Sequence, residues 1–524
     1  MGLRVVIGSS SKSGVCVSLV LLVVAVCTLL PGNACGKRVL LMPSHITSHT
    51  KYHTNIARAL NEIGHEVWVC MPSFLVERNV LDTTGLHVLE YKTDVNIEAL
   101  TMHPLPEKFW RNETENVFDQ AHLMLTYVDQ MLMDKKFGDS VRKLNPSLIV
   151  IDSIPTVYLY ATLAYRLDVP FAIAGSHYDP MTLRVPFNPG AVALPVFQVS
   201  KHMTFPQRVV NLAALSLLYF VDMSGYSNAV ARYAPGRPLI SMEQLMPLAE
   251  VVLVESDHIL DYPQPVLPNV IRIGGAAISE AKPLTGIFKD FVEKNSPEGV
   301  IVVSFGSMVV NLPDYVASKM SNAFQRLNYK FVWRVNMSSP EPGKILTSTW
   351  IPQNDLVAHP NVRLFVSHCG KNGQYEALYN AKPTLCLPLF GDQWYAAERT
   401  RSKGWSLTAN IKEASADDLV EMITELMRNA TYRTRIAKAS EIFKVVQGLP
   451  VKRAAFWLDH VMKYGGAYMR YAGQEMPSYK YYCLDLIAFF GCIFGCVFFL
   501  CYVMCSRCFR RCFSSGKGSK NKRE

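Results

Sequence analysis

The stretch "VSHCGKNGQYEAL", from Val366 to Leu378, is an apolar strand that runs into a polar, glycine-spaced turn and then into a helix start. Unpaired backbone N–H groups at the start of a helix lie at its positive end, so this pattern favours the binding of a phosphate. A metal held by His368 and Cys369 is the alternative, but neither residue has a neighbour at metal-ligand spacing. We therefore expect an anion site and no metal here.

The strand-to-helix pattern recurs along the whole body of the chain. Short β-branched runs alternate with helical patterns, which is typical of parallel βαβ units. The runs are "KRVLLMP", "HEVWVCMP", "PSLIVID" and "VPFAIAG" in the first half, and "GVIVVSFGS", "KFVWRV", "VRLFVSH" and "KPTLCLP" in the second. They predict an α/β fold of two doubly wound domains facing across a cleft, over residues 36–270 and 291–480, with a linker at 271–290. Ligands of such sheets lie beyond the carboxyl ends of the strands.

Both ends of the chain carry membrane signals. Arg4 and Lys12 precede the apolar run Val15–Leu30, the layout of a secretory signal peptide over residues 1–35. Near the other end, residues 484–505 are apolar and long enough to cross a bilayer as one helix. The sequence therefore predicts a single-pass type I membrane protein whose body lies in the lumen.

The tail over residues 506–524 has seven Lys or Arg residues against one Glu, which marks it as the cytoplasmic side. Its last residues, "KNKRE", place Lys520 and Lys522 as in the dilysine retrieval signal of endoplasmic-reticulum membrane proteins, so we expect that membrane. The apolar run Val209–Val221 is too short to span, and we expect core or a surface helix resting on the membrane.

The net charge of +10 is concentrated at the two ends. The tail accounts for +6 and the segment before Cys35 for +2, which leaves +2 for the body. A nearly neutral body argues against nucleic acid as a partner, because its binders need a basic face.

Most of the 13 cysteines lie in the expected signal or beside the span. The body keeps Cys70, Cys369 and Cys386, plus Cys35 if it survives cleavage, so we do not expect a disulfide framework. Three sequons are compatible with glycosylation in the lumen. They begin at Asn112, Asn336 and Asn429.

From Trp350 to Trp405 the chain reads "WIPQNDLVAHPNVRLFVSHCGKNGQYEALYNAKPTLCLPLFGDQWYAAERTRSKGW". This segment resembles the nucleotide-sugar signature of the UDP-glucuronosyltransferase and plant UDP-glycosyltransferase families. The resemblance extends across the body, from "EIGHEV" to "FWLDHVMKYGGA", and includes the terminal topology. It implies a GT-B fold of two Rossmann-like domains and transfer of a hexosyl group from a UDP-sugar with inversion. The UDP-sugar is then a co-substrate, and no cofactor is implied.

The resemblance places the donor site in the second half. Trp350 would stack on the uracil and Gln353 would read its edge. The other contacts are to the diphosphate by Ser307, His368, Asn372 and Gly373, to the ribose by Glu376, and to the sugar hydroxyls by Asp392 and Gln393. Without the resemblance, Trp350 would be a core residue, Glu376 a helix-capping carboxylate and "GDQ" a simple turn. Cys369 departs from the family, which usually has glycine there, so a side chain costs something if the backbone angle is unusual.

The first half should supply the acceptor site and the base. In "PSHITSHTKYH", His45, His49 and His53 recur every four residues, and we expect the first part of this segment to be a loop. Counting back from "GHEV", the resemblance places His49 on the catalytic histidine and Asp152 on its partner carboxylate. A base must take the proton of an acceptor hydroxyl, and Asp152 would orient the imidazole. Asp152 as a helix cap is the alternative, and His45 and His53 are expected to serve packing or the acceptor site.

The donor sugar depends on one further position. In glucuronosyl members the resemblance implies an arginine that pairs with the glucuronate carboxylate, and Glu255, in "VVLVESD", takes its place here. The sequence predicts glucuronosyl or glucosyl transfer to a small lipophilic acceptor, with Glu255 favouring a neutral hexose. A glycolipid-forming transferase and a non-catalytic UDP-sugar-binding partner stay open as alternatives. Gly491 and Gly495 would allow helix pairing in a homo- or hetero-oligomer.

Overall fold

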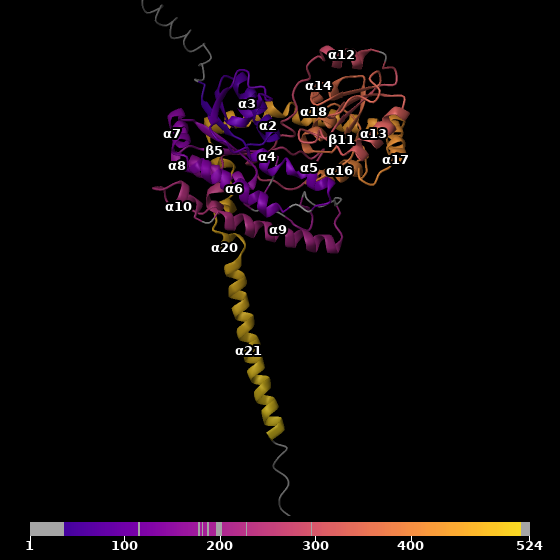
Figure 1. The fold of residues 1–524 in the computed structure, drawn as a ribbon. Coiled ribbons are helices and arrows are strands. Elements are labelled where there is room, and N and C mark those ends of the chain that lie inside the picture. The colour runs from indigo at the N-terminus through magenta and orange to yellow at the C-terminus, as the bar shows by residue number, and fades with distance from the viewer. Residues whose placement is uncertain are drawn as a thin grey trace, which may run out of the picture.

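The computed structural model describes residues 36–514, except 114–115, 177–178, 181, 186–187, 195–201, 227 and 295. The expected signal peptide and the two tail lysines lie outside the described residues. Two α/β units stand side by side, and one long helix leaves the body from below the first of them (Figure 1). The two doubly wound domains expected from the alternating pattern are present.

The first sheet has seven parallel strands in the order β3-β2-β1-β4-β5-β6-β7. The chain moves outward from β1 in one direction and then returns to β4, so the topological switch point lies between β1 and β4, where ligands bind in such folds. The strands are β1 (Arg38–Met42), β2 (Glu66–Pro72), β3 (His87–Tyr91), β4 (Leu148–Asp152), β5 (Phe171–Gly175), β6 (Val252–Val254) and β7 (Val270–Arg272).

The second sheet has six parallel strands in the order β10-β9-β8-β11-β12-β13, and its switch point lies between β8 and β11. Strands β4, β8 and β11 are buried at every residue or nearly so, which explains their continuous apolar runs. The strands are β8 (Val300–Ser304), β9 (Lys330–Arg334), β10 (Ile345–Ser348), β11 (Val362–Ser367), β12 (Thr384–Cys386) and β13 (Ser406–Thr408).

Helices cover both faces of each sheet. Those of the first unit are α2 (Thr47–Glu62), α3 (Ser73–Arg78), α4 (Ile97–Thr101), α5 (Pro104–Trp110), α6 (Val117–Met133), α7 (Lys135–Leu144), α8 (Tyr160–Leu167), α9 (Phe205–Gly225), α10 (Ala229–Tyr233) and α11 (Met242–Leu245). Those that follow are α12 (Gly286–Glu293), α13 (Asp314–Arg326), α14 (Gln353–Ala358), α15 (Lys371–Tyr379), α16 (Gln393–Ser402), α17 (Ala416–Arg428), α18 (Ala430–Gln447), α19 (Pro450–Tyr464), α20 (Ser478–Tyr481) and α21 (Leu484–Ser514).

Helix α19 follows the second sheet in the chain but packs on the first unit. Its buried residues Ala454, Leu458 and Val461 share one hydrophobic core with Ile56 and Leu60 of α2. The two units are therefore held together by an apolar contact as well as by the connector between them.

Helix α2 begins earlier than the Ser/Thr-rich sequence suggested. It starts at Thr47, so the expected loop before Asn55 is wrong. The buried Glu98 of α4 accepts hydrogen bonds from the Thr47 N–H (3.0 Å) and hydroxyl (2.7 Å), and it is paired with Arg78. A carboxylate at the N-terminus of a helix stabilises its unpaired N–H groups, and here it comes from a distant segment.

Within the described residues one helix is long and apolar enough to cross a membrane, over Leu484–Arg511 of α21. The expected span at 484–505 lies inside it. Helix α9, which contains the run Val209–Val221, lies between the body and α21, crosswise to α21 (Figure 1). It is a surface helix rather than core.

The outward face of α9 is apolar, which is the reverse of an ordinary surface helix. Phe205, Val209, Leu212 and Leu217 recur at helical spacing, and each is more than half exposed. The opposite face is anchored by the buried Asn211, whose side chain donates to Pro189 O (2.7 Å) and accepts from Leu194 N–H (2.8 Å).

The loop that holds α9 also contacts the start of the span. The Arg184 side chain donates to Ser478 Oγ (3.0 Å), and Tyr481 OH donates to Arg184 O (3.3 Å). The apolar face of α9 therefore lies on the side of the body from which α21 leaves. Apolar helix faces of this kind lie in the interface of a bilayer.

We expect α9 to lie in the interface of the membrane that α21 crosses. In lipid nanodiscs that contain a carbene-generating lipid, mass spectrometry of the full chain should find label on α21 and on peptides of residues 205–217. The matched control is Ile287 of α12, which is 61% exposed against 52% for Val209 but lies at the opposite end of the body. If α21 is labelled but α9 carries no more label than α12, the expectation for α9 is wrong. If α21 is also unlabelled, the expectation that α21 crosses the membrane is wrong too.

Candidate functional site

The candidate site lies where the carboxyl ends of the two sheets face each other. In the first unit, neighbouring strands end at Asp152 (β4), Gly175 (β5) and Val254 (β6), and His49 comes from the first turn of α2 after β1. The expected donor residues follow strands of the second sheet. Lys371 of α15 reaches across the cleft, where its ammonium donates to Ser176 O (2.8 Å).

His49 and Asp152 meet as the sequence predicted. The Nδ1 atom of His49 donates to Asp152 Oδ2 at 2.8 Å. The imidazole is 17% exposed, and its Nε2 atom has no hydrogen-bond partner among the described residues. Asp152 caps no helix here, because its carboxylate is used by this histidine.

The buried carboxylate of Asp152 accepts four hydrogen bonds, which keep it ionised. Besides His49, the donors are Ser44 N–H (2.9 Å), Ser153 N–H (2.6 Å) and Tyr52 OH (2.7 Å). Burial alone would raise its pKa, but the charge and hydrogen bond of His49 outweigh burial and lower it.

Glycine at the end of β5 makes room for this arrangement. A Cβ atom on Gly175 would lie 2.7 Å from Tyr52 OH and 2.8 Å from Asp152 Oδ1. A larger residue would displace the carboxylate or the tyrosine, since real Cβ atoms do not approach so closely.

Sequence reasoning missed Tyr52. Its hydroxyl donates to Asp152 Oδ1 and lies 3.0 Å from His49 Nδ1, so it touches both members of the pair. Tyr52 follows His49 by three residues, and on a helix that spacing places two side chains on one face. The signal was hidden because this segment was expected to be a loop.

The other two histidines do not share this setting. His45 is buried against Tyr127 OH (2.5 Å), and burial lowers its pKa to about 3, so it stays neutral. His53 is buried beside Tyr52, and its Nδ1 atom donates to His49 O (3.1 Å). Both residues pack, and only His49 presents an imidazole nitrogen to the cleft.

The charge state of His49 suits proton transfer. Burial lowers its pKa, but the charge and hydrogen bond of Asp152 outweigh burial and raise it above the ordinary value. Glu255 and Asp392 act in the same direction. A histidine held this way can accept a proton near neutral pH, and the adjacent carboxylate stabilises the resulting cation.

In the second unit, His368 lies between two glycines. Cβ atoms on Gly306 and Gly370 would lie 2.7 and 2.5 Å from its Nε2 atom, so both positions need glycine. Burial, with the charge of Arg334, lowers the pKa of His368 to about 4. The imidazole is therefore neutral, beside the start of α15, where Asn372 and Gly373 lie in the first helical turn.

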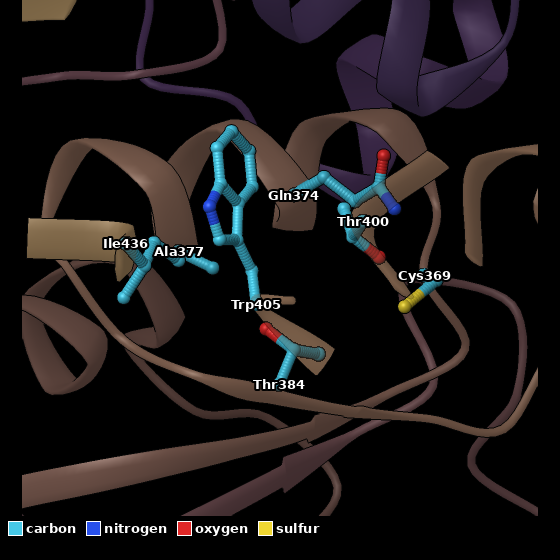
Figure 2. Close-up of a pocket in the computed structure, with 7 residues that line it drawn as sticks. All are labelled: Cys369, Gln374, Ala377, Thr384, Thr400, Trp405 and Ile436. Atoms are coloured by element: carbon cyan, nitrogen blue, oxygen red, sulfur yellow. The ribbon is translucent and has the colours of Figure 1, made fainter. Parts of the chain in front are cut away.

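Cys369 is bonded to Cys386, the last residue of β12, so the expectation that the body would lack disulfides is wrong. Cys386 ends β12, and Cys369 comes two residues after the adjacent parallel strand β11, an arrangement that the spacing of 17 residues does not reveal. The backbone of Cys369 has a φ of 61°, in the left-handed region. Figure 2 shows Cys369 at the edge of a small cavity behind the turn, with Thr400 beside it and Thr384 and Trp405 further across.

The residues expected at the uracil and ribose come together. Trp350 is 62% exposed, which rules out a core role, and among the described rings it meets the edge of Phe288, with the ring centroids 6.5 Å apart. The Gln353 side-chain amide donates to Glu376 Oε2 (2.5 Å). Glu376 is buried within α15 rather than capping it, and Lys51 of α2 lies 3.9 Å from its other oxygen.

The remaining donor residues differ in exposure and in how many of their polar atoms are already hydrogen-bonded. Ser307 and Asp392 are exposed at the cleft edge, after β8 and before α16. Gln393 is buried, and its carbonyl oxygen accepts from Leu389 N–H (2.8 Å) and Phe390 N–H (3.2 Å). Of the Gln393 side chain, only the Nε2 atom is left for a ligand.

Glu255 lies behind the cleft between the first and second units. Its Oε1 atom accepts from Ala276 N–H (2.6 Å), and Oε2 is buried without a hydrogen-bond partner among the described residues. Burial raises the pKa of Glu255 to about 7, against the charge of Lys371. Lys371 was not expected from the sequence, although its place beside the turn could have drawn attention to it.

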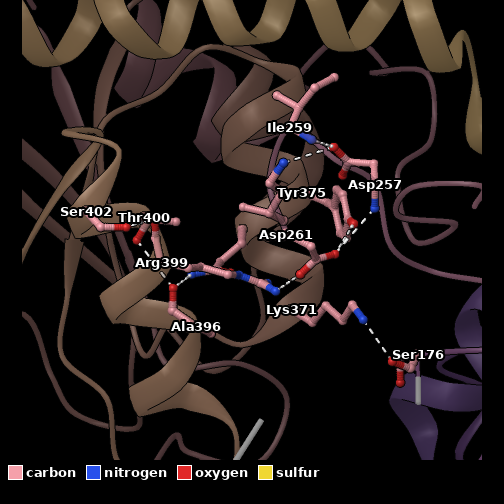
Figure 3. Close-up of polar contacts among 12 residues, drawn as sticks. Ser176, Asp257, Ile259, Asp261, Lys371, Tyr375, Ala396, Arg399, Thr400 and Ser402 are labelled. Carbon is pink, nitrogen blue, oxygen red and sulfur yellow. Dashed lines mark hydrogen bonds and ion pairs between the residues drawn. The ribbon is translucent and has the colours of Figure 1, made fainter. Parts of the chain in front are cut away.

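A polar network ties the connector to the donor helices (Figure 3). Asp257 accepts from the N–H groups of Ile259 (2.6 Å) and Leu260 (2.9 Å), which shapes the connector. Asp261 is paired with Arg399 of α16 and accepts from Tyr375 OH of α15 (3.3 Å). The helices that begin at the donor site are thus also held by contacts further along their length.

The three sequon asparagines, Asn112, Asn336 and Asn429, are all exposed. Asn112 accepts from the Lys412 ammonium (2.6 Å), and Asn429 caps α18 by accepting from Thr431 N–H (3.0 Å). Their glycosylation stays a prediction.

Solved structures of other transferases share this architecture. The glycotransferase of kitacinnamycin superposes with a TM-score of 0.60 at 17% identity, over 81% of this chain and 98% of that one. Glycosyltransferase VinC, in complex with DTDP, superposes with a TM-score of 0.55 at 16% identity, over 81% and 99%. At this identity they show the fold alone, and it is the expected GT-B fold.

Sequence comparison goes further than fold. The chain is 30% identical over 488 residues to UDP-glucuronosyltransferase 1-2 of Rattus norvegicus, covering 87% of this chain and 88% of the rat protein. It is 27% identical over 493 residues to UDP-glucuronosyltransferase 1A1 of Homo sapiens, covering 88% and 90%. Residues 37–519 match the family model described as UDP-glucoronosyl and UDP-glucosyl transferase. The chain therefore belongs to this family of UDP-glycosyltransferases, as the segment from Trp350 to Trp405 suggested.

Proposed function

We propose that the protein transfers a neutral hexosyl group, such as glucosyl, from a UDP-sugar to a hydroxyl of a small lipophilic acceptor. The observation that carries this proposal is the His49–Asp152 pair, with its free Nε2 atom, on the opposite side of the cleft from the start of α15. A proton acceptor on one side and an anion site on the other are what a metal-free transfer from a nucleotide diphosphate needs.

In the proposed reaction the acceptor hydroxyl gives its proton to His49 Nε2 as its oxygen attacks the anomeric carbon. The bond from that carbon to the β-phosphate oxygen breaks, and UDP leaves on the opposite face, which inverts the anomeric configuration. Asp152 stabilises the imidazolium that forms. The charge that develops on the diphosphate is stabilised by the N–H groups at the start of α15, with neutral His368 donating a hydrogen bond.

Glu255 supports a neutral donor sugar. Its carboxylate is buried beside the pair and is not neutralised by an ion pair within 4 Å among the described residues. The carboxylate of a glucuronate bound close to Glu255 would be repelled by this like charge. The charge of Lys371 partly balances Glu255, but the Lys371 ammonium donates its hydrogen bond to Ser176 O.

The apolar face of α9 favours a second candidate, a transferase that forms glycolipids. If α9 lies in the membrane interface, acceptors that partition into lipid would reach the cleft from that side. Sphingoid or sterol acceptors in nanodiscs would then be used at least as well as small phenols in water. Exclusive use of water-soluble phenols would set this candidate aside.

We expect His49→Ala to lower kcat on the order of a hundred- to ten-thousand-fold, because a positioned base contributes that much. Binding of UDP, measured by calorimetry, should stay unchanged, since His49 lies on the acceptor side. Full activity in the variant would remove His49 as the base. A wild-type protein that binds UDP but forms no product with any acceptor would instead be the non-catalytic homologue.

We expect Tyr52→Phe to lower kcat roughly tenfold, the value of one hydrogen bond to a charged group, with the KM for UDP-sugar unchanged. Without the Tyr52 hydroxyl the Asp152 carboxylate keeps more charge, which raises the pKa of His49 further. The base must be neutral to act, so the acid limb of the pH–rate profile should move to higher pH.

The matched control for Tyr52 is Tyr160→Phe. Tyr160 is equally buried, but within the described part of the chain its hydroxyl donates to the Met131 sulfur, at 3.5 Å, and to no carboxylate. This variant should keep both kcat and the pH profile. Equal losses in the two variants would mean that Tyr52 acts through packing and does not position the pair.

We expect discrimination against UDP-glucuronate to depend on pH. The pKa of Glu255 is about 7, so the carboxylate becomes charged as the pH rises through that value. The ratio of kcat/KM for UDP-glucose to that for UDP-glucuronate should therefore increase across neutral pH. Glu255→Gln keeps the volume and the acceptor for Ala276 N–H, and it should lower the ratio on the order of tenfold and flatten its pH dependence.

Exclusive turnover of UDP-glucuronate by the wild-type protein would overturn the neutral-sugar proposal and leave the transfer reaction intact. A ratio that is the same in Glu255→Gln and in the wild type would show that this carboxylate does not select the sugar.

A further inference from the structure

One covalent bond in the described body joins the turn after β11 to the neighbouring strand. Cys369 lies between His368 and Gly370, and its partner Cys386 ends β12, with the two Cα atoms 5.4 Å apart. Both cysteines are fully buried. The bond therefore lies directly behind the residues that face the cleft.

The turn needs a restraint at this position. Cys369 has a φ of 61°, a left-handed conformation that residues with a Cβ atom rarely adopt. Apart from the disulfide, one hydrogen bond holds it, from Cys369 N–H to Ser367 Oγ at 3.1 Å. A residue with a side chain stays in such a conformation only when its surroundings impose it.

Packing behind the turn is incomplete. A small cavity lies behind the turn, between Cys369 and the side chains of Thr384, Thr400 and Trp405 (Figure 2). Movement of the turn toward this space is therefore opposed by less packing than a filled core would supply. The bond to β12 prevents this movement because β12 is an inner strand of the sheet.

The bond also connects two parts of the donor site. The sulfurs pack against Ala397 of α16, and the N-terminus of that helix carries Asp392 and Gln393. The turn itself carries His368 and leads into α15. The pair of His49 and Asp152 belongs to the other sheet and makes no contact with the bond.

We propose that the Cys369–Cys386 disulfide is a positioning device for the UDP-sugar. It holds the turn in the left-handed conformation that presents His368 and the first N–H groups of α15 to the diphosphate, and so it preorganises the donor site. The proposal rests on the proposed donor site at α15. It predicts that loss of the bond weakens binding of the UDP-sugar and leaves binding of the acceptor unchanged.

Three variants of the full-length membrane protein separate the bond from the backbone angle. The double variant Cys369→Ala with Cys386→Ala removes the bond and leaves a Cβ atom at the left-handed position. The double variant Cys369→Gly with Cys386→Ala removes the bond and also the steric cost. Cys70→Ala removes a buried sulfur elsewhere and keeps the bond.

We expect the alanine double variant to raise the Kd for UDP and the KM for UDP-sugar about tenfold, as loss of preorganisation does, with the KM for the acceptor unchanged. The glycine double variant should recover part of the loss, and Cys70→Ala should match the wild type. Thermal unfolding followed by circular dichroism checks that each variant is folded. If the alanine variant does not fold, the glycine variant carries the comparison.

The outcomes distinguish this proposal from the proposed function. Wild-type UDP affinity in both double variants would overturn the positioning role and leave the transferase assignment intact. No UDP binding by the wild type would overturn the donor site itself. Peptide mapping without reductant should find the two cysteines linked in protein from an oxidising compartment, and two free thiols there would overturn the proposal.

Discussion

The buried carboxylate of Asp152 is the constraint on which the acceptor side of the cleft depends. A charge removed from water must be satisfied by hydrogen bonds, and its donors come from the loop after β1, from α2 and from Ser153, the residue that follows β4. These contacts fix the first turn of α2 against β4, at the switch point of the sheet. His49 is thereby held with one nitrogen on Asp152 and the other toward the cleft, which is the orientation that a general base requires.

Two lysines make polar contacts across the cleft at the candidate site. Lys371 of α15 donates to a backbone oxygen after β5, and Lys51 of α2 lies near the carboxylate of Glu376. The apolar contact of α19 with α2 holds the units together away from the site. A nucleotide that enters the cleft therefore meets these two lysine contacts, while the outer contact preserves the arrangement of the sheets.

The donor side is organised differently, by backbone conformation. Glycines on both sides of His368 leave space for its ring, and a left-handed residue follows it directly. A cysteine at that position would be unfavourable by itself, but the bond to Cys386 supplies a restraint that glycine could not. One side of the cleft is thus ordered by a buried charge, and the other by a covalent link between neighbouring segments.

The sequence by itself determined the two doubly wound domains and the α15 turn, because these depend on local patterns, and its resemblance to a known family implied the pairing of His49 with Asp152. It missed the start of α2 at Thr47, Tyr52, Lys371 and the disulfide. Each of these depends on residues distant in the chain: Glu98 stabilises the first turn of α2, Ser176 accepts from Lys371, and adjacent strands bring Cys369 to Cys386. Only the tertiary structure decides such contacts, since strand order sets which segments meet and local periodicity carries no record of it.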